Sequence, residues 1–149
     1  MNKIINEVLK GNYNRSFAFD LFIPEGNAPK EGWPIIVFAH GFKGFKDWGH
    51  WYKIAEAFAT AGYAFLKFNF AFNGTTIKRP SDFEDLEAFG QNNFSKELSD
   101  VQSILDWISQ SHEQYNINLE EVTLIGHSRG GPIALLTAAK DKRIKSVIT

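Results

Sequence analysis

The distribution of hydrophobic residues along the chain predicts strands in alternation with helices. Residues 15–23 read RSFAFDLFI, in which large apolar side chains alternate with small or polar ones, as in an antiparallel strand with one solvated face. Residues 35–39, 63–68 and 122–125 are apolar without alternation, which is typical of parallel strands buried on both faces. Residues 144–149 form a β-branched run that predicts the start of a further strand.

Three segments between these strands have the spacing of helices. One helix is expected between Asp47, its predicted N-cap, and Gly62, where a glycine would end it. A second covers residues 95–111, and a third runs from a glycine-rich turn to about Lys140. Residues 69–93 show no such pattern and predict a long irregular loop, a kind of segment that is usually functional or mobile.

This alternation predicts an α/β fold, a mostly parallel sheet flanked by helices with right-handed crossovers. The loops at the carboxyl ends of the parallel strands are expected to form the working face. Because no repeat, linker or composition shift divides residues 1–149, we expect a single domain. The predicted last strand stops at Thr149, so the domain is expected to be incomplete, with a hydrophobic sheet edge near Val147 open to self-association.

Composition limits the class of protein. Of 149 residues, 44% are hydrophobic and 22% are charged, which excludes disordered and low-complexity chains. The net charge of −1 lacks the basic footprint of a nucleic-acid binder. There is no cysteine, and no two histidines have metal-ligand spacing, so neither a metal nor another cofactor is expected. No signal peptide or membrane-spanning run is present, which predicts a soluble cytoplasmic protein.

The glycine-rich turn carries the candidate chemistry. Residues 126–131 read GHSRGG and contain G-x-S-x-G between a predicted buried strand and a predicted helix. A strand that turns within two residues into a helix strains the central residue, and side chains at Gly126 and Gly130 would collide. The Ser128 hydroxyl is thereby held above the sheet edge. The N–H of Arg129 points from the helix N-terminus toward any oxyanion formed by attack.

A second donor is expected on the loop after the strand at residues 35–39. The sequence A-H-G-F at 39–42 places the N–H of Phe42 at the same sheet edge, because the carboxyl ends of neighbouring parallel strands meet. These two motifs, about ninety residues apart, resemble the α/β-hydrolase superfamily and its branch of small carboxylesterases and acyl-peptidases. The resemblance covers residues 15–149. It implies a nucleophilic Ser128, an oxyanion hole from the Phe42 and Arg129 amides, and hydrolysis through an acyl-enzyme.

The chain departs from that family in its triad, whose order is serine, then acid, then histidine. The 21 residues after Ser128 contain no histidine and one acid, Asp141, which a helix would carry about 18 Å away at 1.5 Å per residue. His127 is directed away from the hydroxyl, and His50 and His112 fall in predicted helical segments. His40 alone is near the correct edge, where packing under the oxyanion loop is favoured over a role as base.

We therefore expect the N-terminal portion of a serine hydrolase of small carboxylic esters, with negligible turnover in this chain alone. Phe42 and Phe72 are the candidates for contact with an acyl substrate. The Arg129 side chain is expected to be solvated or salt-bridged. A peptidase of the same fold and a non-catalytic interaction module remain open as alternatives. Nucleotide binding is not favoured, because neither glycine-rich turn has phosphate-loop or dinucleotide spacing.

Overall fold

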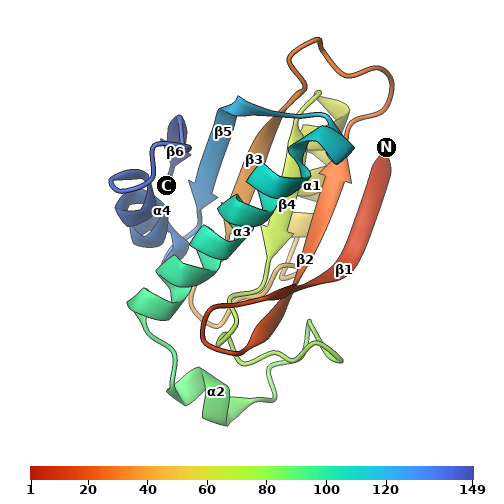
Figure 1. Ribbon diagram of the computed structural model, residues 1–149. Coiled ribbons are helices and arrows are strands. Elements are labelled where there is room, and N and C mark those ends of the chain that lie inside the picture. The colour runs from red at the N-terminus through yellow and green to blue at the C-terminus, as the bar shows by residue number, and fades with distance from the viewer.

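A computed structural model describes residues 1–149 and contains a mixed sheet of six strands (Figure 1). The strands are β1 (Asn2–Lys10), β2 (Ser16–Ile23), β3 (Trp33–Ala39), β4 (Ala64–Phe68), β5 (Ile117–Gly126) and β6 (Ser146–Ile148). The helices are α1 (Trp51–Thr60), α2 (Leu86–Gly90), α3 (Phe94–Tyr115) and α4 (Gly130–Ala138). The order across the sheet is β1-β2-β4-β3-β5-β6, in which β1 and β2 are antiparallel and the other four strands are parallel. The predicted α/β fold is confirmed.

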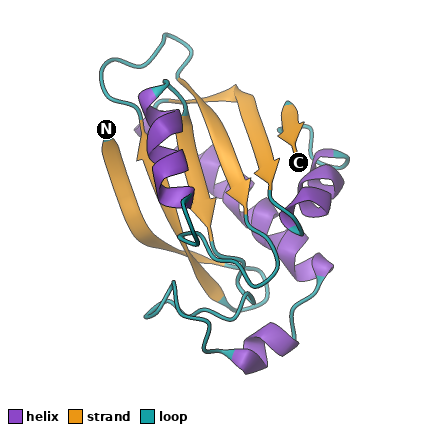
Figure 2. Cartoon of the chain, turned by 180° about the vertical axis from the view of Figure 1, so that it is seen from behind, coloured by secondary structure: helices purple, strands orange, loops and turns teal.

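Helices cover both faces of the sheet, α1 on one side and α3 with α4 on the other (Figures 1 and 2). Successive residues of β3 therefore alternate between two cores: Ile35 and Val37 pack with α3 and α4, whereas Ile36 and Phe38 pack with α1. Burial of each such side chain contributes about 1.5–3 kcal/mol. Because both faces are covered, the strand is apolar without alternation, as the sequence predicted.

The two longest elements extend beyond their predicted limits. Helix α3 runs on to Tyr115, and the chain then turns at Asn116 in a left-handed conformation. The side chain of Asn93 caps the other end by accepting a hydrogen bond from the N–H of Lys96. Strand β5 begins at Ile117, five residues before the apolar run. Helix caps and backbone pairing, rather than hydrophobic period, set these limits.

The predicted N-cap of α1 was wrong. The helix begins at Trp51 after His50, and the carboxylate of Asp47 caps no helix. It is bonded instead to the ammonium groups of Lys46 and Lys67. An aspartate that precedes an amphipathic helix can cap it only if its oxygens are not already bonded to a buried cation.

Strand β1 was not predicted, because its sequence has no alternating pattern and most of its residues are exposed. It is held by pairing with β2 along its length, with an irregularity between Ile4 and Glu7. Within that irregularity Asn6 has a φ of 57°, and its N–H donates to Asp20 on β2. A buried acceptor on the neighbouring strand thus contributes to holding β1 in place.

The C-terminal edge of the sheet is formed by β6, which pairs only with β5. The strand predicted at residues 144–149 is therefore confirmed in its central part. Ile148 on this edge strand is exposed, as are Leu135 and Leu136 on α4, a helix that contacts β6. None of the helices combines the length and hydrophobicity needed to cross a bilayer.

Candidate functional site

Ser128 lies at the bend between β5 and α4. Its φ is +52°, in the left-handed region that non-glycine residues rarely adopt. Two short hydrogen-bonded turns close the bend, since the N–H of Gly130 donates to the oxygen of His127 and that of Gly131 donates to the oxygen of Ser128, each at 2.9 Å. The strain is therefore held by the surrounding backbone, as is usual where geometry serves a functional site.

Glycines on either side make the bend possible. A Cβ atom on Gly126 would lie 2.2 Å from the oxygen of Gly130, and one on Gly130 would lie 2.2 Å from the oxygen of Ala39. Both contacts are with backbone atoms, which cannot rotate away as a side chain can. The steric argument made from the sequence motif therefore applies to both positions.

The loop between β3 and α1 lies against this bend. Gly41 allows the approach, because a Cβ there would lie 3.0 Å from the Cβ of Ser128. The N–H of His127 also donates to the oxygen of Ala39 at 3.0 Å, which ties the two strand ends together. Ser128 is exposed and opens into a cavity of about 210 Å³ between bend and loop. The lining residues are Gly41, Phe42, Lys43, Gly44, Trp48, Trp51, His127 and Ser128.

Several backbone N–H groups near Ser128 have no hydrogen-bond partner in the protein. They include those of Phe42, on the loop, and of Arg129, which directly precedes α4; the N–H groups of Gly41, Lys43 and Ser128 are also unpaired. The N-terminal end of α4 adds a partial positive charge at this point. Unpaired N–H donors and a helix N-terminus therefore lie at the bend that carries Ser128.

The side chain of Arg129 is engaged in the fold, as the sequence predicted. Its Nε lies 2.9 Å from both carboxylate oxygens of Glu97, which is buried on α3. The guanidinium carbon also lies 4.3 Å from the centre of the Phe94 ring. The arginine side chain therefore links the Ser128 bend to α3, whereas the backbone N–H of Arg129 has no partner in the protein.

His40 packs beneath the loop, the arrangement favoured from the sequence. It is buried, and its Nδ1 lies 2.8 Å from the carbonyl oxygen of Gly41, to which it donates, while its Nε2 accepts from the N–H of Phe70. Burial lowers the pKa of His40 to about 4, although the bond to Gly41 opposes that shift. The ring is therefore neutral at pH 7 and supports the loop.

No histidine or acid, His40 included, is hydrogen-bonded to the Ser128 hydroxyl. The His127 ring packs against Trp51, with ring centres 5.0 Å apart. His112 lies within α3, whereas His50 precedes α1 and is not in the helix where it was expected. Asp141 follows α4 and binds Arg143, which holds the pKa of that carboxyl below its usual value. It has its own partner, in agreement with its rejection as the triad acid.

The two phenylalanines named as substrate contacts differ in position. Phe42 is 60% exposed and lines the cavity beside Ser128, with its ring centre 5.4 Å from that of Phe89. Phe72 is only 7% exposed, belongs to the main core and lies under the ammonium of Lys96. It does not line this cavity. Substrate contact by Phe42 stays a prediction, and the position of Phe72 gives no support to the same role.

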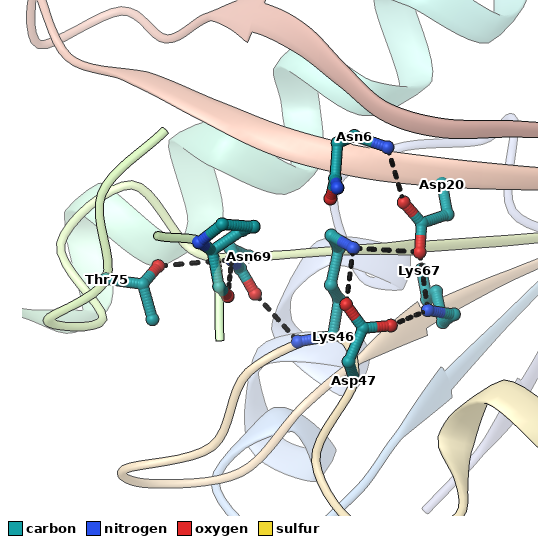
Figure 3. A network of polar contacts seen from close by, with 8 residues as sticks. Asn6, Asp20, Lys46, Asp47, Lys67, Asn69 and Thr75 are labelled. Carbon is teal, nitrogen blue, oxygen red and sulfur yellow. Dashed lines mark hydrogen bonds and ion pairs between the residues drawn. The ribbon is translucent and has the colours of Figure 1, made fainter. Parts of the chain in front are cut away.

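The sequence reasoning missed a buried group of charges where the loop meets strands β2 and β4 (Figure 3). Asp20, Lys46 and Lys67 are all buried, and each of the two ammonium groups is bonded to Asp20 and to Asp47. The solvated face predicted for β2 was wrong, because the strand is buried on both faces and Asp20 is only 1% exposed. Lys67 gave a signal, since it interrupts the apolar sequence FLKF. A charged residue inside a buried strand requires a partner of opposite charge.

Asp100 on α3 was also missed. It is buried, and burial raises its pKa to about 7, with the charge of nearby Glu97 acting in the same direction. The N–H of Ala71 donates to it at 2.8 Å and opposes the shift. This carboxyl therefore lies between α3 and the start of the long loop that follows β4.

Residues 34–149 match the sequence profile of a family described as the alpha/beta hydrolase fold. The chain belongs to this alpha/beta hydrolase family. The quorum-quenching protein AidA of Acinetobacter baumannii (strain MDR-ZJ06) is 32% identical over 120 residues, covering 78% of this chain and 34% of AidA. An uncharacterized 31.7 kDa protein from the traX-finO intergenic region of Escherichia coli is 28% identical over 136 residues, covering 91% of this chain and 42% of that protein. This alpha/beta hydrolase chain spans less than half the length of these relatives.

Solved structures show the same fold. Hypothetical protein PA2218 from Pseudomonas aeruginosa has a TM-score of 0.74 at 24% identity, covering 98% of this chain and 40% of PA2218. Est1E from Butyrivibrio proteoclasticus, solved with bound ferulic acid, has a TM-score of 0.72 at 23% identity, covering 95% of this chain and 50% of Est1E. At these identities the likeness concerns the arrangement of strands and helices. It places the Ser128 bend of this alpha/beta hydrolase within a fold that the other proteins share.

Proposed function

We propose that this alpha/beta hydrolase acts on small carboxylic esters with Ser128 as nucleophile. The observation that carries the proposal is the strained Ser128, exposed at the bend between β5 and α4 and facing a cavity. The unpaired N–H groups of Phe42 and Arg129 supply the proposed oxyanion hole. Support also comes from esterases that share the fold, among them Est1E and brefeldin A esterase.

The proposed reaction has two steps. The Ser128 oxygen attacks the ester carbonyl carbon, and the carbonyl oxygen, now an anion, accepts hydrogen bonds from the two amides. Collapse of this intermediate expels the alcohol and leaves an acyl-enzyme, from which water releases the carboxylic acid. Each oxyanion donor is worth about 2.7–4 kcal/mol of barrier. Phe42 supplies an exposed apolar surface beside the reacting atoms for the acyl group.

Residues 1–149 alone are proposed to turn over ester at a negligible rate. Ser128 needs a base to accept its proton, and no histidine in these residues is placed to do so. Because the chain spans less than half of its curated relatives, we propose that the whole protein supplies the acid and the histidine from other segments. Loss of triad members typically costs on the order of 10⁴–10⁶ in kcat.

Hydrolysis of p-nitrophenyl acetate tests the proposal. The whole protein should show turnover that Ser128→Ala reduces by about 10⁴-fold or more, whereas Ser111→Ala, on α3, serves as the matched control and leaves the rate unchanged. Residues 1–149 alone should show no turnover above the Ser128→Ala background. Turnover that survives in Ser128→Ala would reject Ser128 as the nucleophile.

Assays on the whole protein also distinguish an esterase from a peptidase and from a non-catalytic interaction module. A peptidase of this fold would cleave an aminoacyl amide at a rate comparable to the matched ester, whereas an esterase would cleave mainly the ester. A non-catalytic interaction module is favoured by the unpartnered Ser128 hydroxyl of these residues. Such a module would not react with a fluorophosphonate probe in the whole protein.

Self-association through β6 is proposed for residues 1–149 and is tested by sedimentation velocity.

A further inference from the structure

Four charged side chains form a group where the loop that carries Phe42 meets strands β2 and β4 (Figure 3). We call Asp20, Lys46, Asp47 and Lys67 the buried charge cluster. The Nζ of Lys46 lies 2.9 Å from Asp20 and 2.6 Å from Asp47, and the Nζ of Lys67 lies 2.5 Å from Asp20 and also contacts Asp47. Asp20 and both lysines are buried, and only Asp47 is partly exposed, at 28%.

The cluster is electrically neutral and well satisfied. Each of the two ammonium groups contacts both carboxylates, and the second oxygen of Asp20 accepts the N–H of Asn6 at 2.8 Å. The Lys67 ammonium also lies 5.5 Å from the ring centres of Phe22 and Tyr52. Burial of charge is costly even when the charges are paired, so stability alone is a weak reason for this arrangement.

The cluster joins the loop to the centre of the sheet. Asp20 on β2 and Lys67 on β4 are directly opposite each other in the strand register. Lys46 and Asp47 lie on the loop between β3 and α1, four and five residues after Phe42. The cluster therefore fixes one end of the segment that carries the Phe42 N–H, while its start is fixed by β3.

A set of amide groups completes this attachment. The N–H of Lys46 donates to the side-chain oxygen of Asn69 at 2.7 Å, and Asn69 in turn donates to Thr75 and to the oxygen of Pro80 (Figure 3). The side-chain nitrogen of Asn73 donates to the oxygen of Gly44 at 3.2 Å. The long segment after β4 thus supports the same loop from the opposite side.

The loop has little internal structure of its own. Within residues 41–48 the backbone makes two hydrogen bonds, from Gly44 to Gly41 and from Trp48 to Phe45. Lys43 has a φ of +55°, which is strained for a lysine. Conformations of this kind persist only where surrounding contacts impose them. The contacts that could do so are the bond between His40 and Gly41, the buried charge cluster, and the amides of Asn69 and Asn73.

We propose that the buried charge cluster positions the loop so that the N–H of Phe42 faces Ser128. Asp20, Lys46, Asp47 and Lys67 are positioning residues, since none of them lines the cavity. When one ammonium is removed, two carboxylates share the remaining one. The Asp47 carboxylate, which has access to water, then moves outward, and the loop moves with it. The catalytic consequence rests on the proposed function, whereas the structural consequence does not.

Hydrogen exchange in the whole protein tests the structural consequence. Asp47→Asn keeps the side-chain shape and removes one charge at the partly exposed position, so the fold should survive. The N–H groups of Gly44 and Lys46 should exchange at least about tenfold faster, with β2 and β4 unchanged. Asp106→Asn is the matched control, because it also removes a paired acid. Asp106 lies on α3, and its carboxylate is 2.8 Å from the Arg143 guanidinium. It should leave the exchange of Gly44 and Lys46 unaltered.

Kinetics of the same variants test the catalytic consequence. Because an oxyanion donor acts mainly in the transition state, Asp47→Asn should lower kcat by about tenfold and change KM by less than about twofold. Lys67→Met should act in the same direction; if it does not fold, Asp47→Asn decides. Unchanged exchange at Gly44 and Lys46, or equal acceleration throughout β2 and β4, would overturn the proposal. If Ser128→Ala retains turnover, the proposed function fails, and hydrogen exchange still decides the role of the cluster.

Discussion

Two turns meet at the candidate site, and they are held in place by different means. The bend at Ser128 is shaped by its own sequence: two glycines leave room for backbone atoms that would otherwise lie 2.2 Å from a Cβ. The loop that carries Phe42 is attached through Lys46 and Asp47 to Asp20 on β2 and Lys67 on β4, at least 20 residues away in the sequence. A steric requirement can be read from adjacent residues, whereas an attachment by distant charges cannot.

The comparison also predicts different modes of failure. Crowding the bend at Ser128 forces the backbone of two strands apart, so the damage should spread to the sheet. Removing a charge from the cluster should act first on the loop, because Asp47 is the member nearest to water. Four substitutions, from the largest expected effect to the smallest, separate these modes.

Lys67→Met should destabilise the protein by about 3–5 kcal/mol, because it leaves two carboxylates, the buried Asp20 and the partly exposed Asp47, facing one ammonium. Urea unfolding followed by far-UV circular dichroism measures this. The double variant Lys67→Met with Asp20→Asn restores neutrality and should be less destabilised than the sum of the two single variants. Additive losses would show that the cluster does not act as a unit.

Gly130→Ala should cost about 3 kcal/mol, because the added Cβ would lie 2.2 Å from the oxygen of Ala39 on β3. The same unfolding experiment applies. Gly90→Ala in α2 is the matched control, since nothing lies within 4 Å of a Cβ at that position, and it should be neutral or slightly stabilising. Equal effects of the two substitutions would contradict the steric account of the bend.

Asp100→Asn should stabilise the protein by about 2 kcal/mol at pH 8. The pKa of Asp100 is about 7 in the folded state and near 3.8 when unfolded, so its contribution is favourable at low pH and is lost as the pH rises from about 4 to 7. Each pKa unit is worth about 1.36 kcal/mol, and the cost of burying the new amide offsets part of the gain. Thermal unfolding at pH 4 and pH 8 measures it.

His40 gives this prediction a second arm. Its folded pKa of about 4 lies below the unfolded value of 6.5, so its contribution is present above pH 6.5 and is lost as the pH falls toward 4. The two slopes oppose each other in the native protein. Asp100→Asn removes the opposing slope, so the stability of this variant should rise more steeply between pH 4 and 6.5 than that of the native protein. A flat profile in that variant would show that His40 is not buried as described.

Arg129→Lys should have the smallest effect, a loss of about 1 kcal/mol. A lysine keeps the charge opposite Glu97 but loses the Nε hydrogen bond shared between both carboxylate oxygens and the packing on Phe94. Because the bend is set by glycines, the φ of Ser128 should not change. Unfolding measures the loss, and a crystal structure of the variant checks the bend; a Ser128 φ below zero would show that the side chain shapes it.

Much of the fold could be predicted because its signals are local. The apolar run of β3 reports a strand covered on both faces, and helices α1 and α4 follow with the expected order. The paired positions of Asp20 and Lys67 could not be predicted from the apolar pattern, because they depend on the register between β2 and β4. This register also places the Lys67 ammonium where it pairs with Asp47, which is why Asp47 forms an ion pair and does not cap α1.

The sequence by itself determined the Ser128 bend and the strands that lead into it. Those features depend on steric contacts within a few residues and on which positions are apolar, and both are written in the order of the amino acids. Only the tertiary structure decided that Phe72 is buried, that β1 joins the sheet, and that Lys46 and Lys67 are buried beside Asp20. Burial of a charge depends on what distant segments bring to it, so its partner is known only when the chain is folded.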